Sequence, residues 1–579
     1  MLLSTLLLGL LSGVAGQTAT SSAFDALATR PSSVLGNATA FVDAKFHPPS
    51  GPVKVTGMLQ DGLGIFLGIP FAQPPVGDLR FKKPVPASYE KHIMATERPP
   101  ACLQQLGSVA ANVSGISEDC LFVNVITPAN AVGEGCKLKD LPVLVWIYGG
   151  GFYGGSAVLY TSPSLSSHAL NSGKPIVLVT IGYRVGIFGF GHGREMRANG
   201  ALNLGLRDQL LGLQWVKDNI AGFGGDPCKV TIFGESAGSM SVSAHMLNQT
   251  QDLFRGAIMQ SGTVTSLGGF GDDTVYQEPY DKLVEFAGCN GTESSFLCLK
   301  ALSGEDLLAA QVEMTSSKFA YTWGYPFGPA IDGDLIPASP YHMIENGTFS
   351  KIPFIAGCNS DEGTTFISAS LSPNLTAWPL STAMEIAYPF PLPQEFYDRI
   401  GGFYPRDGTG CPFNSGTDLF NGSVSAAWKQ VTAVFTDLLM ESRRRWLLRT
   451  ANGHGLNQTW SYEFRGYSPP DPPYWGSSHE ADKPYVFGRA VPELGYSPDQ
   501  VALGKAMMDY WINFVYCLDP NGEGDSGLAH WPTHDFPTNK NSLEMDIGSL
   551  KVIQDDFREQ SMAYINEPQN AFYIRKRDM

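Results

Sequence analysis

The sequence predicts an α/β fold in which a large, mostly parallel central sheet is flanked by helices. Short apolar runs typical of buried strands occur at Val143–Trp146, Ile176–Ile181 and Val230–Phe233, and a helical pattern at Arg207–Asp218 separates the last two. Strands that alternate with helices are the pattern of a mostly parallel sheet. With 579 residues and a hydrophobic content of 43%, the chain also has enough apolar material for a large core.

The run Val230–Phe233 leads directly into Gly234-Glu235-Ser236-Ala237-Gly238, and a helix is expected over 237–247. A strand that reverses sharply into a helix holds its apex residue in a strained backbone, and glycines on both sides leave room for neighbouring chains. Ser236 would project its hydroxyl into open space there, at the positive end of the helix. The sequence therefore predicts that Ser236 is a catalytic nucleophile.

A serine nucleophile needs a histidine to remove its proton and a carboxylate to orient that histidine. The strand pattern Ile352–Gly357 leads into Asp361 and Glu362, which places both acids at the carboxyl end of a strand, where such sheets carry their sites. The histidines beyond these acids are His454, His479, His530 and His534. We expect His479, in the loop Gly476–Glu480, to be the base. These residues alone leave Asp361 and Glu362 both open as the acid.

Further motifs extend from about residue 50 to about residue 535. They are Glu118-Asp119-Cys120-Leu121, Trp146–Phe152, Asn203–Gln209, Phe223–Pro227, the serine pentapeptide, Gln260-Ser261-Gly262, Pro329–Gly333, Asp361-Glu362-Gly363, His479 with Phe487-Gly488, and Tyr510–Phe514. In these motifs and their order the chain resembles the carboxylesterase/cholinesterase family, also called type-B carboxylesterases and lipases. The resemblance implies an α/β-hydrolase fold.

The resemblance also implies a role for each triad candidate. Ser236 is then the nucleophile, Glu362 the acid and His479 the general base, while Asp361 is a neighbour. The implied reaction is acyl transfer in two steps, in which His479 accepts the serine proton, protonates the departing alcohol and then activates water in the same way. This chemistry needs no metal and no organic cofactor, and the sequence contains no HExxH, paired CxxC or Walker-type motif.

The glycine run before Phe152 resembles the oxyanion loop of the family. The amides of Gly150, Gly151 and Ala237 are thereby implied to bind the oxyanion. Glycine is needed at the first two positions because a side chain would block the approach of the acyl group. Ser261 resembles a family position that supports the active site from behind the triad.

Two features bear on the substrate. The resemblance places the loop 103–119 over the active-site gorge, and its seventeen residues include no aromatic side chain. Without an aromatic ring, this loop has no side chain that could bind a quaternary ammonium group by a cation–π contact, which argues against cholinesterase activity. So short a lid also weakens the case for interfacial activation. By family position, Trp323, Tyr325 and Phe327 line the acyl pocket and favour apolar or flat acyl groups.

Three classes of function remain open. The preferred one is a secreted serine carboxylic ester hydrolase of the general esterase type. The second is a lipase or steryl esterase that uses the same residues on long-chain esters. The third is a catalytically silent binding protein of this fold, and the presence of every triad and oxyanion residue argues against it. The expected partner is a small-molecule or lipid ester, because a net charge of −16 argues against nucleic acid.

The amino terminus predicts a secretory signal peptide over residues 1–16, with an apolar core that ends in small residues. We expect residues 17–579 to form a single α/β-hydrolase catalytic domain with helical excursions, and to be extracellular. No later stretch is long and apolar enough to span a membrane, so we expect no integral membrane association. Secretion also predicts glycans at several of the sequons Asn37, Asn112, Asn248, Asn290, Asn346, Asn374, Asn421 and Asn457.

Nine cysteines in an oxidising compartment predict structural disulfides, and the odd count leaves at least one thiol unpaired or used between chains. Spacing alone assigns no pair. The resemblance implies one disulfide between Cys102 and Cys120 and another between Cys289 and Cys298. The cysteines that remain unassigned are Cys136, Cys228, Cys358, Cys411 and Cys517.

Overall fold

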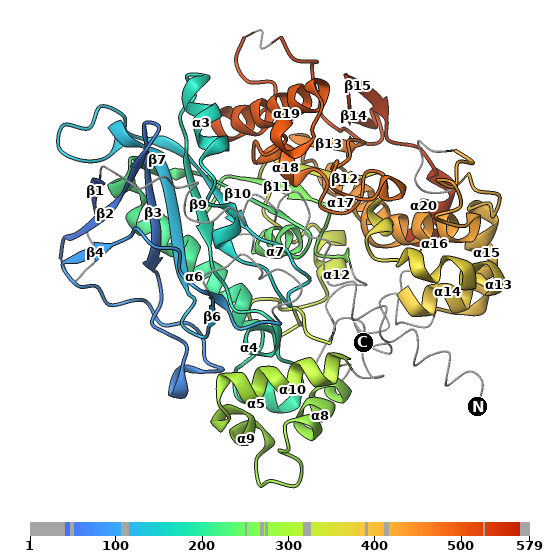
Figure 1. Ribbon diagram of the computed structural model, residues 1–579, viewed down its shortest axis with the longest axis horizontal. Helices are drawn as coiled ribbons and strands as arrows, with labels where there is room; N and C mark the ends of the chain where they lie inside the picture. The colour runs from blue at the N-terminus through green and yellow to red at the C-terminus, as the bar shows by residue number, and fades with distance from the viewer. Residues whose placement is uncertain are drawn as a thin grey trace.

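The computed structural model describes residues 41–46, 51–105, 115–248, 252–266, 271, 276–316, 326–387, 392–409, 416–524 and 527–567. Several sequence predictions fall outside these ranges, namely the signal peptide at 1–16, the middle of the loop 103–119, Trp323, Tyr325, Cys411, and the sequons at Asn37 and Asn112. The helices and strands are labelled as in Figure 1.

One large sheet forms the centre of the fold (Figure 1). In spatial order its strands are β1 (Phe41–Phe46), β2 (Val53–Gln60), β3 (Leu63–Pro70), β7 (Phe122–Pro128), β9 (Val177–Ile181), β8 (Leu141–Ile147), β10 (Gly225–Glu235), β11 (Gly256–Gln260), β12 (Phe354–Asn359), β13 (Thr459–Phe464), β14 (Asn541–Asp546) and β15 (Ser549–Gln554). The short strand β4 (His92–Met94) pairs with β2, and β5 (Ala101–Cys102) pairs separately with β6 (Ile116–Ser117).

The sheet is parallel at its centre and antiparallel at both ends. From β9 through β14 each strand runs parallel to the next. The strands β1, β2, β3 and β7 at one end, and β15 at the other, pair antiparallel. Every residue of β8, β9, β11 and β12 is buried, which is why these strands read as continuous apolar runs. The predicted α/β fold with a mostly parallel central sheet is confirmed.

Helices pack beside this sheet and also form two larger excursions. Those associated with the sheet include α3 (Ser164–Asn171), α4 (Gly186–Phe190), α6 (Leu204–Asn219), α7 (Ala237–His245), α12 (Pro340–Glu345), α17 (Ser442–Gly453), α18 (Lys483–Val486) and α19 (Pro498–Cys517). The helical pattern predicted at 207–218 lies within α6. None of the described helices is long and apolar enough to cross a membrane.

The two excursions lie at different edges of the molecule in Figure 1. The lower group contains α5 (Arg194–Ala198), α8 (Gln277–Phe286), α9 (Ser295–Ala301) and α10 (Gly304–Ser316). The right-hand group contains α13 (Ser372–Ala377), α14 (Leu380–Ala387), α15 (Gln394–Phe403), α16 (Ala426–Thr436) and α20 (Glu559–Asn566). A π-helical turn at Asp437–Glu441 joins α16 to α17.

The fold contains the two disulfides that the resemblance implies, Cys102–Cys120 and Cys289–Cys298. The described cysteines that remain as thiols are Cys136, Cys228, Cys358 and Cys517. The described sequon asparagines lie at the surface: Asn374 is half-buried, and the exposed ones are Asn248, Asn290, Asn346, Asn421 and Asn457.

Candidate active site

Ser236 lies at a sharp turn between a strand and a helix. It follows the last residue of β10, precedes the first residue of α7, and has φ 55° and ψ −125°. The turn requires its glycines, because a Cβ atom on Gly238 would lie 2.0 Å from the carbonyl oxygen at the end of β8. The Ser236 amide donates to the carbonyl of Gln260 at 3.0 Å, which holds the turn against β11. Such strain at a strand-to-helix turn is typical of a nucleophilic serine.

Glu362 and His479 come together from loops that follow different strands. Glu362 begins a short turn, Glu362–Thr364, after β12, whereas His479 lies between β13 and α18. Nδ1 of His479 lies 2.5 Å from Oε2 of Glu362, and the other oxygen accepts from the amide of Asn359 at 2.7 Å. Glu362 therefore favours the tautomer with hydrogen on Nδ1, which leaves Nε2 of the neutral imidazole as a proton acceptor.

Asp361, the other acid that the residues left open, holds two loops together. Its amide donates to the carbonyl of Ser477 at 3.0 Å, and its Oδ2 accepts from the amide of Ser477 at 3.1 Å. The side chain of Asn359 donates to the carbonyl of Ser478 at 2.7 Å. These bonds join the end of β12 to the loop that precedes His479, so they set the position of the imidazole.

The other three histidines that follow Glu362 in the chain, His454, His530 and His534, have different surroundings. Nε2 of His454 lies 2.8 Å from the carbonyl oxygen of Glu345. Nδ1 of His534 lies 2.7 Å from Oδ1 of Asn452, and His530 is exposed. Of the four, His479 is the one that the structure brings against an acid proposed for the triad.

The loop at residues 149–155, called the glycine loop, packs directly against Ser236. A Cβ atom on Gly149 would lie 2.9 Å from the Cβ of Ser236, and one on Gly150 would lie 2.4 Å from a backbone oxygen of its own loop. Gly150 has φ 112° and Gly151 has φ 62°, values that favour glycine. Within the described part of the chain, the amides of Gly150, Gly151 and Ala237 have no hydrogen-bond acceptor. These three donors are available to an anion.

A second carboxylate faces the other nitrogen of His479. Oε1 of Glu235 lies 3.2 Å from Nε2 of His479, and Oε2 of Glu235 lies 3.4 Å from Nζ of Lys483. Burial raises the pKa of Glu235, although Lys483 and His479 oppose the rise. Burial acts to lower the pKa of His479, but the carboxylates of Glu235 and Glu362 outweigh it and raise that pKa. Glu235 and His479 therefore compete for a proton.

Sequence reasoning missed Lys483. This residue is the first of α18 and is only 3% exposed, although lysine is seldom buried without a partner. Its one signal in the sequence is a lysine four positions after the predicted base, at the start of the otherwise apolar run Lys483–Phe487. That signal does not reveal the partner, because Glu235 is 248 residues away along the chain.

Ser261 belongs to a buried polar layer near the turn of Ser236. It follows β11, is fully buried, has φ 53°, and donates its amide to the carbonyl of Gly357 at 2.8 Å. The preceding Gln260 donates to Asp482 at 2.8 Å, and Tyr462 donates to the same carboxylate at 2.8 Å. Burial raises the pKa of Asp482 despite these bonds. The layer links the ends of β11 and β13 to the segment that follows the imidazole.

Of the three aromatic residues assigned to the acyl pocket, only Phe327 is described. Its side chain is 1% exposed, and its ring centroid lies 5.6 Å from that of Tyr153, which belongs to the glycine loop. The ring of Phe366 lies 4.9 Å from the imidazole of His479. Aromatic rings therefore lie beside both the glycine loop and the candidate base, as a site for apolar groups requires.

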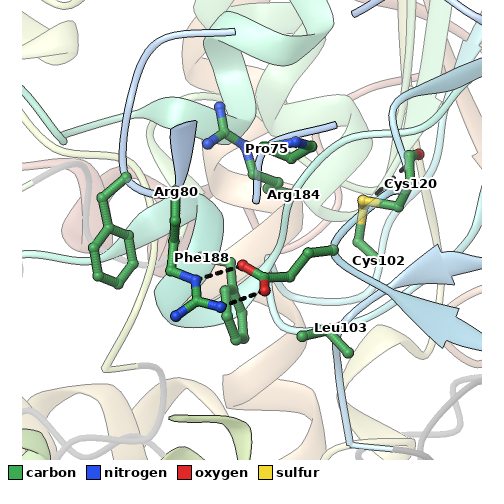
Figure 2. Close-up of a pocket in the computed structure, with 9 residues that line it drawn as sticks. Pro75, Arg80, Cys102, Leu103, Cys120, Arg184 and Phe188 are labelled. Carbon is green, nitrogen blue, oxygen red and sulfur yellow. Dashed lines mark hydrogen bonds and ion pairs between the residues drawn. A yellow bond between two sulfur atoms is a disulfide. The ribbon is translucent and has the colours of Figure 1, made fainter. Parts of the chain in front are cut away.

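A small cavity lies beside the first disulfide (Figure 2). Its volume of about 10 Å³ is that of roughly one water molecule, so it is no site for an ester. Arg80 crosses it and donates to both carboxylate oxygens of Glu118, at 2.6 and 2.5 Å, and also to the carbonyl of Lys300 at 3.0 Å. This ion pair anchors Glu118, two residues before Cys120 of the first disulfide, against Arg80. No three His, Cys, Asp or Glu side chains in the described ranges form a group that could hold a metal.

Comparisons with known proteins bear on the family and the fold. The model of the Carboxylesterase family matches residues 51–565. The chain is 36% identical over 538 residues to Secreted lipase 1 of Botryotinia fuckeliana, with 88% of this chain and 90% of that protein covered. It is 34% identical over 557 residues to Secreted triacylglycerol lipase LIP1 of Gibberella zeae, with 91% and 90% covered. The crystal structure of Aspergillus niger EstA aligns with a TM-score of 0.77 at 26% identity, over 91% of this chain and 99% of that chain.

Proposed function

Because this chain belongs to the carboxylesterase family and is a carboxylic ester hydrolase with the α/β-hydrolase fold, we propose that Ser236, His479 and Glu362 form its catalytic triad. The observation that carries the proposal is the 2.5 Å contact between Nδ1 of His479 and Oε2 of Glu362. The strained turn at Ser236, which is 8% exposed, supports it from the side of the nucleophile.

The proposed reaction passes through an acyl-enzyme. Nε2 of His479 accepts the proton of Ser236 as its Oγ attacks the ester carbonyl, and the same nitrogen then protonates the departing alcohol. Water attacks the acyl-enzyme with the help of the same base and releases the acid. Glu362 stays ionised throughout, because its part is to orient the imidazole and to stabilise the imidazolium.

The amides of Gly150, Gly151 and Ala237 bind the oxyanion in this proposal. Their support is that the described structure offers these amides no acceptor and that the glycine loop packs against Ser236. Ala237 adds its amide at the start of α7, where the helix dipole also favours negative charge. One such donor contributes about 3 kcal/mol to transition-state stabilisation.

The enzyme acts outside the cell in this proposal. Its support is the signal peptide predicted at residues 1–16 and the names of two relatives, which are both called secreted. Residues 17–579 would then form one catalytic domain, and a large sheet built from strands between residues 41 and 554 supports that reading. The exposed sequons of the described chain would carry glycans.

A carboxylic ester of general type is the proposed substrate, and a long-chain lipid ester is the second candidate. The short loop 103–119 without an aromatic residue favours open access and the general esterase. The names of the fungal relatives, a lipase and a triacylglycerol lipase, favour the second candidate. Both candidates use the same triad, so they differ in the acyl chain that the pocket accepts.

Hydrolysis of p-nitrophenyl esters from acetate to palmitate tests the triad and the substrate together. Ser236→Ala should lower kcat by roughly 10⁶-fold, because a lost serine nucleophile has an effect of that size. Ser243→Ala is the matched control, since this buried serine lies on α7, the helix that Ser236 precedes, and it should keep full activity. Equal activity in the Ser236→Ala enzyme and the parent would overturn the proposed nucleophile.

The chain-length profile of the same series decides between the two substrate candidates. A maximum at short soluble esters supports the general esterase. Activity that rises steeply when long-chain esters pass their solubility limit supports the lipase. An emulsified triacylglycerol gives an independent readout of the second outcome.

A further inference from the structure

Lys483 is a buried lysine beside the proposed triad. Its side chain is 4% exposed, and its ammonium lies 2.9 Å from Oε2 of Glu480 and 3.4 Å from Oε2 of Glu235. The hydroxyl of Tyr160 lies 3.5 Å away. Burial opposes the charge, but Glu235 and Glu480 outweigh it and hold the pKa of Lys483 well above its usual range. The site therefore contains a permanent positive charge that the triad chemistry does not itself use.

Glu235 lies between this lysine and the imidazole. Its carboxylate is fully buried, with one oxygen 3.2 Å from Nε2 of His479 and the other facing Lys483. Oε1 of Glu235 and Nε2 make no hydrogen bond, but at 3.2 Å the negative charge of Glu235 favours a proton on Nε2, as imidazolium. That proton occupies the lone pair of Nε2. Nε2 then cannot accept the proton of Ser236.

The charge of Lys483 opposes the binding of that proton. A cation within about 4–6 Å lowers the pKa of a carboxyl group by about 1–3 units, because it stabilises the ionised form. Burial raises the pKa of Glu235 to about 8, and Lys483 opposes that rise and so favours the ionised carboxylate. The same positive charge partly cancels the field with which Glu235 would otherwise retain a proton on the imidazole.

Among the described residues, the other titratable groups that face Lys483, Glu235 and His479 are carboxyl groups and phenols. Glu362 faces Nδ1 of His479 from the turn after β12, and Glu480 faces Lys483 from the preceding loop. Asp482 is anchored by Gln260 and Tyr462 and acts on Glu235 as a further negative charge. The phenols that face the cluster are those of Tyr160 and Tyr183. Each of these carboxylates strengthens proton binding at the imidazole or at Glu235, so the lysine is their counterweight.

We propose that Lys483 is a positioning residue that weakens proton binding at Nε2 of His479 and at Oε1 of Glu235, so that Nε2 can accept the serine proton at a lower pH than it could without the lysine. Lys483 acts through Glu235 and touches no reacting atom. Its neighbour Glu480 has the opposite effect, because it neutralises part of the ammonium charge from 2.9 Å away. The inference rests on the proposed function, in which His479 is the base.

The pH profile of kcat/KM for a soluble short-chain p-nitrophenyl ester tests this role, since its acidic limb reports the protonation of the base in the free enzyme. Lys483→Met keeps the length of the side chain and removes its charge, so the acidic limb should move to higher pH by about one unit or more. Glu480→Gln should move the limb to lower pH. That second shift should be smaller, because 35% of the Glu480 side chain is exposed.

General damage to the fold would not move the acidic limb in opposite directions in Lys483→Met and Glu480→Gln. Opposite shifts therefore identify the proposed role. In a Glu235→Gln background, Lys483→Met should lose most of its shift, because the carboxylate through which it acts is gone. The proposal is overturned if the acidic limb of the pH profile is unchanged in the two single variants, or if it moves in the same direction in both. If Lys483→Met does not fold, Glu480→Gln still decides: a limb at lower pH supports the proposal, and an unchanged or raised limb overturns it.

The outcome for Lys483 is distinguishable from the outcome for the triad. Hydrolysis that survives Ser236→Ala would overturn the proposed function and, with it, the inference. Hydrolysis that is lost in that variant, together with an unmoved acidic limb in Lys483→Met, would overturn the role of Lys483 alone.

Discussion

The charges around His479 and those around Asp555 are both buried, yet they are balanced differently. In the Asp555 cluster, made of Arg444, Arg445, Asp555 and Glu441, two cations face two anions. Arg444 donates to both oxygens of Asp555 at 2.8 Å and to Glu441 at 2.6 Å, and Arg445 donates to Asp555 at 2.8 Å. In the His479 cluster, the carboxylates of Glu235, Glu362 and Glu480 surround one lysine and one imidazole.

Under the proposed function, this difference separates a structural cluster from a reactive one. Burial acts to raise the pKa of Asp555, but Arg444 and Arg445 outweigh it and hold that pKa far below the usual range. For Glu235, burial dominates and the pKa is raised. Asp555, with two guanidinium partners, keeps its charge, whereas burial raises the pKa of Glu441, whose guanidinium partner is Arg444, to about 7. Glu235 shares one lysine with other anions, so burial raises its pKa towards the neutral range. Such a carboxylate can affect the proton affinity of the neighbouring His479, the proposed base.

The largest effect should come from removing the acid of the His479 cluster. Glu362→Gln should lower kcat by about 10⁴-fold, because an amide cannot fix the imidazole tautomer or stabilise the imidazolium. The melting temperature should change little, since glutamine keeps the shape of the side chain and can still accept from the amide of Asn359. Steady-state kinetics and thermal unfolding of the same preparation check both statements. A comparable loss in Asp361→Asn with none in Glu362→Gln would reverse the assignment of the acid.

The corresponding change in the Asp555 cluster should affect stability and leave the chemistry alone. Asp555→Asn leaves two buried guanidinium groups without their shared anion, which should reduce the stability of the fold by about 3–5 kcal/mol. The folded fraction should retain the kcat of the parent enzyme. Thermal unfolding measures the loss, and activity per folded molecule measures the rest.

Glu559→Gln is the matched control for that prediction. Glu559 pairs with Arg449 at 3.0 Å, but 38% of its side chain is exposed, so its loss should change stability by less than about 1 kcal/mol. Equal destabilisation by the two substitutions would show that burial does not distinguish the ion pairs. A loss of kcat in folded Asp555→Asn would contradict the separation of the two clusters.

The third effect concerns the uncharged side of the active site. Gly150→Ala should lower kcat by about 10²–10³-fold, because the loop must move and its amide loses aim at the oxyanion. The expected movement follows from the φ of 112° and from the 2.4 Å contact that a Cβ atom would make. KM for a soluble ester should change less than kcat. Gly173→Ala is a suitable control, since this glycine also has positive φ, at 73°, but a Cβ atom there meets nothing within 4 Å.

Local sequence patterns predicted the part of the site that is local. The strand, the glycines and the helix around Ser236 lie within about twenty consecutive residues, so spacing alone indicated the turn. The strands expected at 143–146 and 230–233 lie within β8 and β10, and the pattern at 176–181 matches β9 to within one residue. These elements are buried on both faces, and their apolar runs are correspondingly clear.

Contacts between distant loops were beyond the local patterns. Asp361 and Glu362 are adjacent in the chain and chemically alike, and only the approach of His479, 117 residues away, distinguishes them. Lys483 is a single charged residue in an otherwise apolar run. Its partner Glu235 reaches it because the fold brings the end of β10 beside the first residue of α18. The outermost strands β1 and β15 were likewise not predicted, because they are partly exposed and give weaker apolar signals.

The smallest effect concerns a buried histidine that has no carboxylate partner. His245 on α7 is 3% exposed, and its Nε2 lies 2.8 Å from Oε1 of Gln209. Burial lowers its pKa from 6.5 to about 4, the opposite direction to that of His479, which is equally buried but faces two carboxylates. Two carboxylates facing the imidazole of His479 therefore reverse the effect that burial alone has on the pKa of His245.

The sign of the resulting pH dependence follows from the two states. Below pH 6.5 the unfolded chain protonates His245 while the folded chain does not, so the contribution to stability is complete above pH 6.5 and is lost as the pH falls towards about 4. The loss approaches about 1.4 kcal/mol per pH unit for this group. His245→Gln should flatten the melting temperature against pH in this window. His342→Gln, on the exposed surface of α12, should leave the slope unchanged. An unaltered slope in His245→Gln would mean that this imidazole takes up its proton equally in both states, and that the absence of a carboxylate does not keep it neutral.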